Sequence, residues 1–210
     1  MSEERLEWAR RLQAVAQNGL AYTEGTFDRE RYEQIRAIAS EIMASSSEDS
    51  SETAPRFETL FAEQAGYATP KLDIRSVVLD EEYRVLLVRE KEDGLWTLPG
   101  GWVDVGDSPS ESAEREVKEE SGYEVRVERL LALLNRDNYP HPPHPFHMYK
   151  LYVLCALTGG EAVTETVETS GVGFFDVEDL PPMSEGRTLP DQVRELVSMA
   201  CGESGGAALD

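Results

Sequence analysis

The side chains best suited to chemistry are three glutamates, Glu116, Glu119 and Glu120, which stand close together in the sequence. On a helix, residues three and four apart share a face, so their carboxylates come together. Like charges placed in this way repel each other, and partial burial adds a desolvation cost, unless a cation lies among them. Carboxylate oxygens without nearby His or Cys favour Mg²⁺ or Mn²⁺, which commonly bind phosphates as well. The spacing therefore indicates a divalent-metal site for phosphate chemistry.

A helix predicted at residues 109–121 must position these carboxylates. Ser108 is suited to cap the helix, Pro109 to its first position, and Glu111 to the third position, where it completes a capping box. Gly122 is suited to end the helix because glycine readily adopts the left-handed conformation. Local residue types therefore indicate both ends of the helix.

One face of this helix is apolar and is predicted to be buried, with Ala113 and Val117 at its centre. Glu116 and Glu120 flank this stripe, so their carboxylates lie next to the body of the protein. Arg115 can reach Glu119 four residues later and orient its carboxylate. The solvent side is predicted to carry Glu111, Glu114 and Lys118. The alternative for such a charge run is an acidic face that only meets water.

The whole segment GGWVDVGDSPSESAEREVKEESGY, residues 100–123, resembles the Nudix box. The positions that match the pattern are Gly101, Arg115, Glu116, Val117, Glu119, Glu120, Gly122 and Tyr123. Asp107 departs from the pattern, because the family usually has Glu there. The shorter side chain keeps the charge, and in the family this position mainly supports the loop and helix, so we expect activity to survive.

The resemblance implies an α+β fold, an α/β/α sandwich with a mixed β-sheet. It implies that Glu116, Glu119 and Glu120 are the main ligands of Mg²⁺ or Mn²⁺, with help from the backbone at Gly101. These ions would bridge a pyrophosphate, offset its charge and activate a water for attack on phosphorus. Arg115, Glu119 and Glu120 would be catalytic residues on this interpretation.

A general base is also needed, and in relatives it is a glutamate of the box or one in a loop before a late strand. Glu168, ahead of GVGFF, is the loop candidate, and Glu165 is the second. A plain loop carboxylate is the alternative for Glu168, because loop geometry cannot be inferred from sequence.

The resemblance extends through most of the chain to the Nudix subgroup with an N-terminal helical domain, described as acting on X-linked nucleoside diphosphates. It implies a pyrophosphatase that cleaves ADP-ribose to AMP and ribose 5-phosphate, with CDP-choline or a related nucleotide alcohol or sugar as the alternative. Tyr139 and Pro140 do not decide between substrates, because different Nudix groups carry Tyr or Pro near this position. The candidate substrate-binding residues are Arg75, Trp96, Trp102, Tyr139 and His147.

The motif HPPHPFH contains His141, His144 and His147 and raises the question of zinc. Its prolines preclude a regular helix, and no Cys or His cluster elsewhere completes a tetrahedral site, so zinc is disfavoured. A Pro-rich loop at the mouth of the site is the preferred interpretation, where an aromatic ring or a His could contact a base or a phosphate. Trp96 and Trp102 bracket the glycines and could serve similarly, although aromatic residues beside turns often only pack.

Two N-terminal segments with apolar residues at helical spacing predict a helical hairpin. The apolar positions are Trp8, Leu12 and Val15 in the first segment and Ile35, Ile38, Ala39 and Ile42 in the second. Asp28 is suited to cap the second helix, and residues 45–52 have the composition of a flexible linker. Because so small a hairpin cannot bury its own apolar face, we expect a homodimer through these helices.

Short β-rich runs from Ile74 onward predict strands, and residues 193–200 predict a last helix. The runs are IRSVVL, RVLLVRE, WTLP, YEVRVERLLALL, HMYKLYVLCALT and GVGFFDV. We therefore expect a helical hairpin at residues 1–50, a linker and short helix at 51–70, a Nudix domain at 71–202 and a flexible tail at 203–210.

The 20 basic and 41 acidic residues give a net charge of −21. A polyanionic partner would meet a repulsive field, so binding to duplex nucleic acid is not expected. The Asp/Glu-rich, Lys-poor composition resembles that of salt-adapted proteins. No apolar run reaches the roughly 20 residues of a membrane span, and the N-terminus lacks the apolar stretch of a secretory signal, so we expect a cytoplasmic protein without a membrane partner.

Two other functions compete with this interpretation. A Nudix-like regulator could sense nucleotides without turnover, but Arg115, Glu116, Glu119 and Glu120 are all present, which favours an enzyme. An enzyme for oxidised nucleotides or capped RNA is the third option, and the acidic composition disfavours RNA.

Overall fold

The chain folds as two units, which a computed structural model describes for residues 3–46, 51–202 and 206–210. The larger unit comprises Lys71–Pro142 and Met148–Asp210, and the smaller comprises Met1–Pro70 and Pro143–His147. Residues 47–50 of the predicted linker and 203–205 of the predicted tail lie outside the described residues. No described helix has the length and apolar character that crossing a membrane requires.

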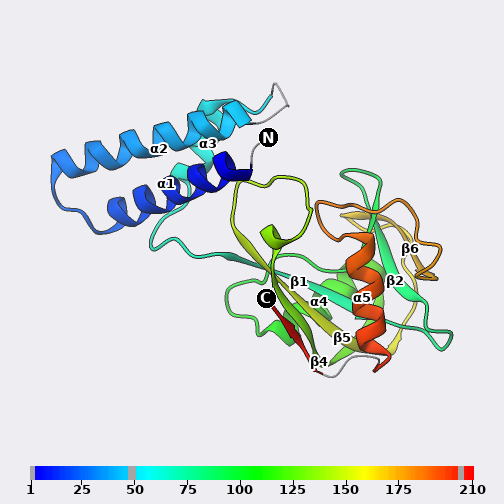
Figure 1. Cartoon of the computed structure of the whole chain (residues 1–210). Coiled ribbons are helices and arrows are strands. Elements are labelled where there is room, and N and C mark those ends of the chain that lie inside the picture. Colours follow the sequence, from blue (N-terminus) through cyan, green and yellow to red (C-terminus); the bar gives the residue numbers. More distant parts are fainter. Residues whose placement is uncertain (1–2, 47–50, 203–205) are drawn as a thin grey trace. The chain divides into compact units, whose positions relative to one another are not determined.

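Two β-sheets form the centre of the larger unit (Figure 1). The first has the order β1-β5-β4-β7, with bounds Lys71–Val78, Met148–Gly160, Tyr123–Asn135 and Ala208–Leu209. The second has the order β3-β2-β6, with bounds Trp96–Thr97, Val85–Glu90 and Thr169–Phe175. Strand β5 is parallel to β1 and antiparallel to β4, so the first sheet is mixed. The predicted mixed sheet is confirmed.

Two helices of the larger unit pack on opposite sides of the first sheet (Figure 1); they are α4 (Pro109–Ser121) and α5 (Pro190–Ala200). Successive residues of a strand point to opposite faces, so β1 contributes to both cores. Its Ile74 and Val78 join a core with Val117 of α4. Its Val77 joins the other core with Val193 of α5. The predicted α/β/α sandwich is therefore confirmed, and β1 contributes to both of its cores.

The smaller unit has three helices, which are the predicted hairpin and the predicted short helix after it; they are α1 (Glu3–Tyr22), α2 (Thr26–Ser46) and α3 (Ala54–Ala62). Phe57 and Phe61 of α3 complete its core, which also includes Leu6 and Met43, and Phe146 packs against it. The larger unit begins at Lys71, where the Nudix domain was predicted to begin, and α3 joins the two hairpin helices in the smaller unit. The third helix thus supplies the buried aromatic side chains of this core.

The buried stripe of the first helix also differs from the prediction. Ala9 and Ala16 are fully buried, whereas Trp8 and Val15 are 51% and 53% exposed. Small alanines let two helices approach closely, and this close packing leaves the larger apolar side chains outside. Asp28 lies in the first turn of α2 and is not its cap, because the helix begins at Thr26.

The end of the chain is more ordered than the predicted flexible tail. Ala208 and Leu209 form strand β7, which pairs in parallel with Ala132 and Leu133 of β4. The pairing depends on a strand distant in sequence, so no local pattern of so short a segment could indicate it.

Candidate active site

The start and end of α4 have the geometry that the residue types predict. Ser108 Oγ accepts the backbone N–H of Glu111 at 3.3 Å, and Glu111 Oε2 accepts that of Ser108 at 2.8 Å. Gly122 has a φ of 81°, and its N–H bonds to the carbonyl of Lys118. This capping box and left-handed end fix the length of the helix. The direction of the three glutamates is thereby fixed as well.

A glycine loop after β3 lies directly against β1. Ser76 and Ile74 donate their N–H groups to the carbonyls of Pro99 and Gly101 at 2.9 and 2.8 Å. Gly100 has a φ of 139°, and a Cβ there would lie 2.0 Å from the carbonyl oxygen of Ile74. Only glycine fits a position with this conformation and this close an approach. The carbonyl of Gly101, a predicted metal contact, is already an acceptor from Ile74, although its second lone pair is not involved in that bond.

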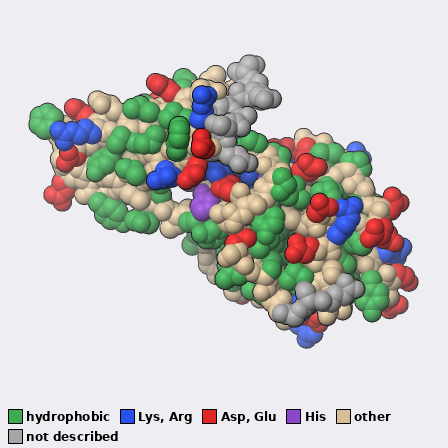
Figure 2. Space-filling model, viewed as in Figure 1, with side chains coloured by type: hydrophobic (Ala, Val, Ile, Leu, Met, Phe, Trp, Pro, Cys, Tyr) green, Lys and Arg blue, Asp and Glu red, His purple; other side chains and the backbone are tan. Residues whose placement is uncertain are grey.

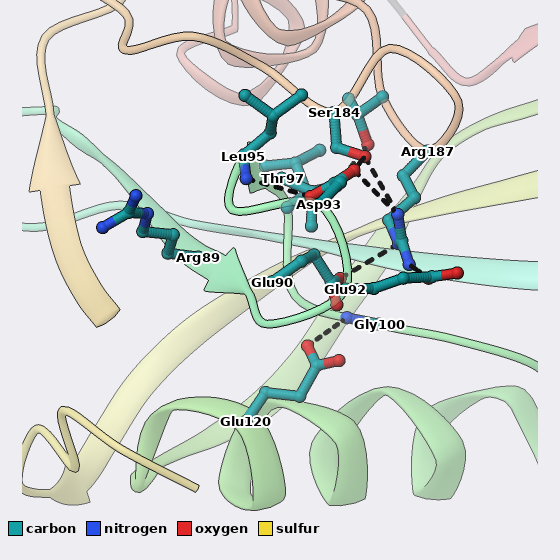
Figure 3. Close-up of polar contacts among 12 residues, drawn as sticks. Arg89, Glu90, Glu92, Asp93, Leu95, Thr97, Gly100, Glu120, Ser184 and Arg187 are labelled. Carbon is teal, nitrogen blue, oxygen red and sulfur yellow. Dashed lines mark hydrogen bonds and ion pairs between the residues drawn. The ribbon is translucent and has the colours of Figure 1, made fainter. Parts of the chain in front are cut away.

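Two of the three glutamates reach this loop. Glu120 Oε2 accepts the N–H of Gly100 at 2.9 Å (Figure 3). A Cβ on Gly101 would lie 3.3 Å from Glu116 Oε2, so that carboxylate lies against the loop as well. Glu116 and Glu120 are 9% and 4% exposed, whereas Glu119 is exposed. The helix and the loop thus enclose two carboxylates and leave the third at the rim.

These buried carboxylates are incompletely compensated by cations. Burial raises the pKa of Glu120 to about 8, helped by the negative charges of Glu90 and Glu116 and opposed by Arg75 and the N–H of Gly100. Burial also raises the pKa of Glu116, and Arg115 opposes that rise. A cation placed among such groups would relieve both desolvation and repulsion.

Arg115 organises the outer edge of the site. Its guanidinium lies 2.8 Å from Glu116 Oε1 and 3.2 Å from Glu119 Oε2, so the predicted contact with Glu119 is present. It also lies 3.3 Å from Asp107 Oδ2, which accepts the hydroxyl of Ser112 at 3.4 Å. The shorter Asp107 therefore still reaches both the arginine and the helix. Glu114 differs from its prediction, because it is half-buried and accepts the N–H of Val127 at 3.0 Å.

The donor set fits a hard divalent ion in chemistry, although it is not arranged as a finished site. Among the described residues, no group of three or more His, Cys, Asp or Glu side chains stands in a metal-holding arrangement. Glu116 and Glu119 are both turned to Arg115. An ion would therefore have to replace the guanidinium at Glu116. The buried, incompletely compensated oxygens of Glu116 and Glu120 are what such an ion would satisfy.

Arg75, predicted to contact substrate, lies inside the fold. It is 5% exposed, pairs with Asp73 at 2.8 Å and donates to the carbonyl of Leu98 at 3.1 Å. Lys150, from the neighbouring strand, also pairs with Asp73. Arg75 therefore contributes positive charge near Glu120 from within the protein. Sequence alone could not show that this arginine is buried.

The loop proposed to carry the general base is attached to the end of α4. Thr169 donates its hydroxyl to the carbonyl of Glu120 at 2.8 Å. Glu168, one residue earlier, is exposed and close enough to Glu90 to affect its pKa. Glu165, the second candidate, lies 3.4 Å from the ammonium of Lys91. Glu168 is thus the candidate nearer the buried carboxylates.

The aromatic and histidine candidates are scattered. Trp96 packs edge-on against Phe175 with ring centroids 4.7 Å apart, whereas Trp102 is 46% exposed. Tyr139 donates its hydroxyl to Asp210 at 3.3 Å. His147 belongs to the smaller unit. Among these candidates, Trp102 keeps the most surface for a ligand.

The three histidines of HPPHPFH belong to different units. His141 is in the larger unit, and its Nδ1 lies 2.7 Å from the carbonyl oxygen of Glu185. His144 is in the smaller unit, where its carbonyl accepts the guanidinium of Arg10. The motif therefore spans two units of the fold and is not one local cluster.

Sequence reasoning missed one buried acid of the site, Glu90, and its partner Arg187. Glu90 ends β2, is 7% exposed and pairs with Arg187 Nε at 3.1 Å (Figure 3). Glu90 was treated only as part of a strand. The sequence did carry a signal for this pair: Glu90 stands at the end of the hydrophobic run VLLVRE, and an acid buried with such a strand normally requires a cationic partner.

Comparison with known proteins gives two family matches. Residues 3–57 match the family described as "UDP-X-like, N-terminal oligomerisation domain". Residues 69–195 match the family described as "NUDIX domain". Together they cover α1, α2 and the part of the larger unit that holds the site, from β1 into α5.

Individual relatives agree with these matches. A protein of Bacillus subtilis (strain 168) named "Putative ADP-ribose pyrophosphatase YjhB" is 44% identical over 191 residues, 91% of this chain and 89% of that protein. The crystal structure of a UDP-X diphosphatase is 32% identical, with a TM-score of 0.63, and the match covers 99% of this chain and 98% of that chain. The crystal structure of an ADP-ribose pyrophosphatase from Streptococcus suis 89-1591 is 38% identical, with a TM-score of 0.61, and covers 68% of this chain and 100% of that chain.

Proposed function

Because the chain belongs to the Nudix hydrolase family, we propose that it hydrolyses the pyrophosphate bond of a nucleoside diphosphate linked to another group, with Mg²⁺ or Mn²⁺. The observation that carries the proposal is the pair of buried carboxylates, Glu116 and Glu120, held against the Gly100 loop. Burial raises the pKa of Glu120 to about 8 despite the charge of Arg75, and a carboxylate whose charge is so poorly balanced is a candidate for function.

ADP-ribose is the proposed substrate, with AMP and ribose 5-phosphate as products. The names of the Bacillus subtilis relative and of the Streptococcus suis structure support it. A uridine diphosphate derivative is the second candidate, because the UDP-X diphosphatase matches nearly the whole chain. CDP-choline stays an alternative, although the names of these three relatives do not favour it.

The roles of the residues follow from their positions. Glu116, Glu119 and Glu120 would hold the divalent ion, which when bound supplies positive charge to the pyrophosphate and acidifies a water. Arg115 orients Glu119 through its ion pair. The N–H of Gly100 fixes one oxygen of Glu120. Glu168 is proposed to accept the proton of the attacking water at its carboxylate.

We also propose a homodimer through the N-terminal helices. Large apolar side chains are exposed on α1 and α2, and hydrophobic surface gathers over these helices (Figure 2). These residues are Trp8, Val15, Tyr22, Phe27 and Ile38. Such apolar surface is typical of a contact with another chain, and the matched family is described as an oligomerisation domain. Light scattering should give twice the mass of the chain; a monomeric mass would contradict the proposal.

The test of function is a substrate panel with purified protein, with and without Mg²⁺ or Mn²⁺. The panel contains ADP-ribose, UDP-sugars, CDP-choline and dinucleoside polyphosphates, and the variants are Glu120→Gln and, as a control, Glu124→Gln. Glu124 is exposed and pairs with Lys118, so its variant should keep full activity. We expect metal-dependent turnover that Glu120→Gln abolishes. A protein that binds nucleotides but cleaves none with either ion would favour a sensing role.

A further inference from the structure

One arginine in the loop between β6 and α5 binds carboxylates of β2 and of the turn that follows it (Figure 3). Arg187 pairs with Glu90 at 3.1 Å, with Glu92 at 2.5 Å and with Asp93 at 3.2 Å. The side chains of Glu92 and Asp93 are 79% and 30% exposed, whereas that of Glu90 is 9% exposed. Solvent screens exposed pairs, so the contact with Glu90 is the strongest of the three.

Glu90 is a buried acid beside the proposed catalytic carboxylates. Burial raises the pKa of Glu90, and the charges of Arg187 and Arg75 oppose that rise. The charge of Glu90 in turn adds to the rise that burial causes in the pKa of Glu120. In Figure 3 Glu90 lies between Arg187 and the Gly100–Glu120 hydrogen bond. Among the described residues, Arg187 is the cation that forms an ion pair with Glu90. Without Arg187, a buried carboxylate would therefore be left next to Glu120 with no cation in contact.

The loop that carries Arg187 is fixed along β3. The N–H of Ser184 bonds to the carbonyl of Trp96 at 2.7 Å, and its hydroxyl bonds to Asp93 at 2.6 Å. The hydroxyls of Thr97 and Thr188 are 3.1 Å apart. Arg187 is therefore presented to Glu90 by a well-bonded loop, and this loop keeps contacts that do not depend on Glu90.

We propose that Arg187 is a positioning residue that acts through Glu90: it holds the Glu90 carboxylate away from Glu120, so that Glu90 adds negative potential to the metal site without becoming a ligand. The inference rests on the proposed function. Neither residue touches the reacting atoms. The held carboxylate attracts a divalent ion at a distance, and the coordination positions stay with Glu116, Glu119 and Glu120.

The test uses full-length Arg187→Gln, Arg187→Lys, Glu90→Gln and the Glu90→Gln/Arg187→Gln double variant. Arg194→Gln is the matched control, because Arg194 is a surface arginine of α5 that pairs with the exposed Asp191. Calorimetry measures the affinity for Mn²⁺, and thermal unfolding checks that each variant folds. The kinetic constants kcat and KM are measured with the substrate that the panel identifies. The calorimetry needs no turnover.

The two readouts should move in opposite directions. Released from its arginine, Glu90 becomes an extra ligand, so Arg187→Gln should bind Mn²⁺ about 3-fold or more tightly while kcat falls by about 10-fold or more and KM changes little. Glu90→Gln should weaken Mn²⁺ binding by a few-fold. The double variant should behave like Glu90→Gln, because it has no Glu90 carboxylate left to bind the ion. Arg187→Lys should lie between wild type and Arg187→Gln, and Arg194→Gln should match wild type.

A double variant as impaired as Arg187→Gln would overturn the proposal, since Arg187 would then act only by holding its loop. Unchanged Mn²⁺ affinity in Arg187→Gln would overturn it too. If Arg187→Gln does not fold, folding of the double variant supports the proposal and its failure to fold contradicts it. If the wild-type protein cleaves no tested nucleotide, the proposed function fails. The Mn²⁺ affinities of the same proteins then still test the proposed role of Arg187 and Glu90.

Discussion

Two buried carboxylates of the larger unit, Asp73 and Glu120, meet the cost of burial in opposite ways. Burial alone would raise the pKa of Asp73, but Arg75 and Lys150 lower it to about 2. Burial raises the pKa of Glu120 to about 8, although the same Arg75 opposes the rise. Arg75 thus acts on both carboxylates, but Asp73 also has Lys150 as a second cation, whereas Glu120 does not.

The difference separates a structural acid from the acid proposed to bind the metal. Asp73 is within ion-pair distance of Arg75 and Lys150, and it ties β1 to β5. Glu120 has one N–H bond and buried like charges around it, so it keeps capacity for a further cation. Buried acids whose charge is incompletely balanced are where metal binding and catalysis are expected.

The largest effect on stability should come from Asp73→Asn. The change leaves Arg75 and Lys150 buried without their carboxylate, and breaking a buried pair in this way costs about 3–5 kcal/mol. Urea unfolding measures the loss. Asp191→Asn, on the surface of α5, should change the free energy of unfolding by less than about 0.5 kcal/mol. A loss at Asp73 no larger than at Asp191 would remove the distinction between the two acids.

Glu120→Gln should have the opposite effect on stability. The amide keeps a hydrogen-bond acceptor for Gly100 but carries no charge, so at pH 8 the free energy of unfolding should rise by about 2–4 kcal/mol. Activity should fall by at least about 100-fold, more than for loss of an outer-shell contact. Unfolding and turnover are measured on the same metal-free and metal-loaded preparations. A variant both less stable and fully active would refute the assignment.

The two acids should also give opposite pH dependence in metal-free protein. The folded pKa of Asp73 is below its unfolded value, so its contribution is present above about pH 4 and is lost as the pH falls toward 2. The folded pKa of Glu120 is above its unfolded value, so stability falls as the pH rises from about 4.5 to 8. Urea unfolding between pH 4 and pH 9 should show that fall in wild type. The fall should be reduced in Glu120→Gln, and an identical slope in both would contradict the raised pKa.

The smallest effect should come from Ser108→Ala, which removes the cap of α4 and leaves its carboxylates in place. Loss of such a cap costs about 1 kcal/mol. Turnover at 25 °C should stay within about 2-fold of wild type, because the buried face still anchors the helix. A loss of activity comparable to that of Glu120→Gln would mean that the helix terminus itself takes part in the site.

The sequence predicts this helix well because its signals are local. Ser108, Glu111 and Gly122 set its ends within a few residues, and Ala113 and Val117 fix its buried face. The helical spacing then turns Glu116 and Glu120 inward without any information from distant segments. The smaller unit is harder to predict, because α1 packs through Ala9 and Ala16, which a search for large apolar residues overlooks.

The parts that sequence could not give depend on contacts between distant residues. Glu90 and Arg187 are far apart in the chain, and nothing near either one indicates the other. Arg75 was predicted to contact substrate, but it is buried and pairs with Asp73. Ion pairs between residues far apart in the chain decide which charged residues are structural, and the sequence around each residue does not reveal these pairs.

Calorimetric titration of metal-free protein with Mn²⁺ near pH 7, in buffers of different ionisation enthalpy, tests the central claim most directly. With a pKa of about 8, Glu120 is largely protonated at that pH, so binding should release a proton. We predict tight binding with proton release in wild type, and weak binding without that release in Glu120→Gln. Equal affinity and equal proton release in the two proteins would show that the ion does not bind at Glu120.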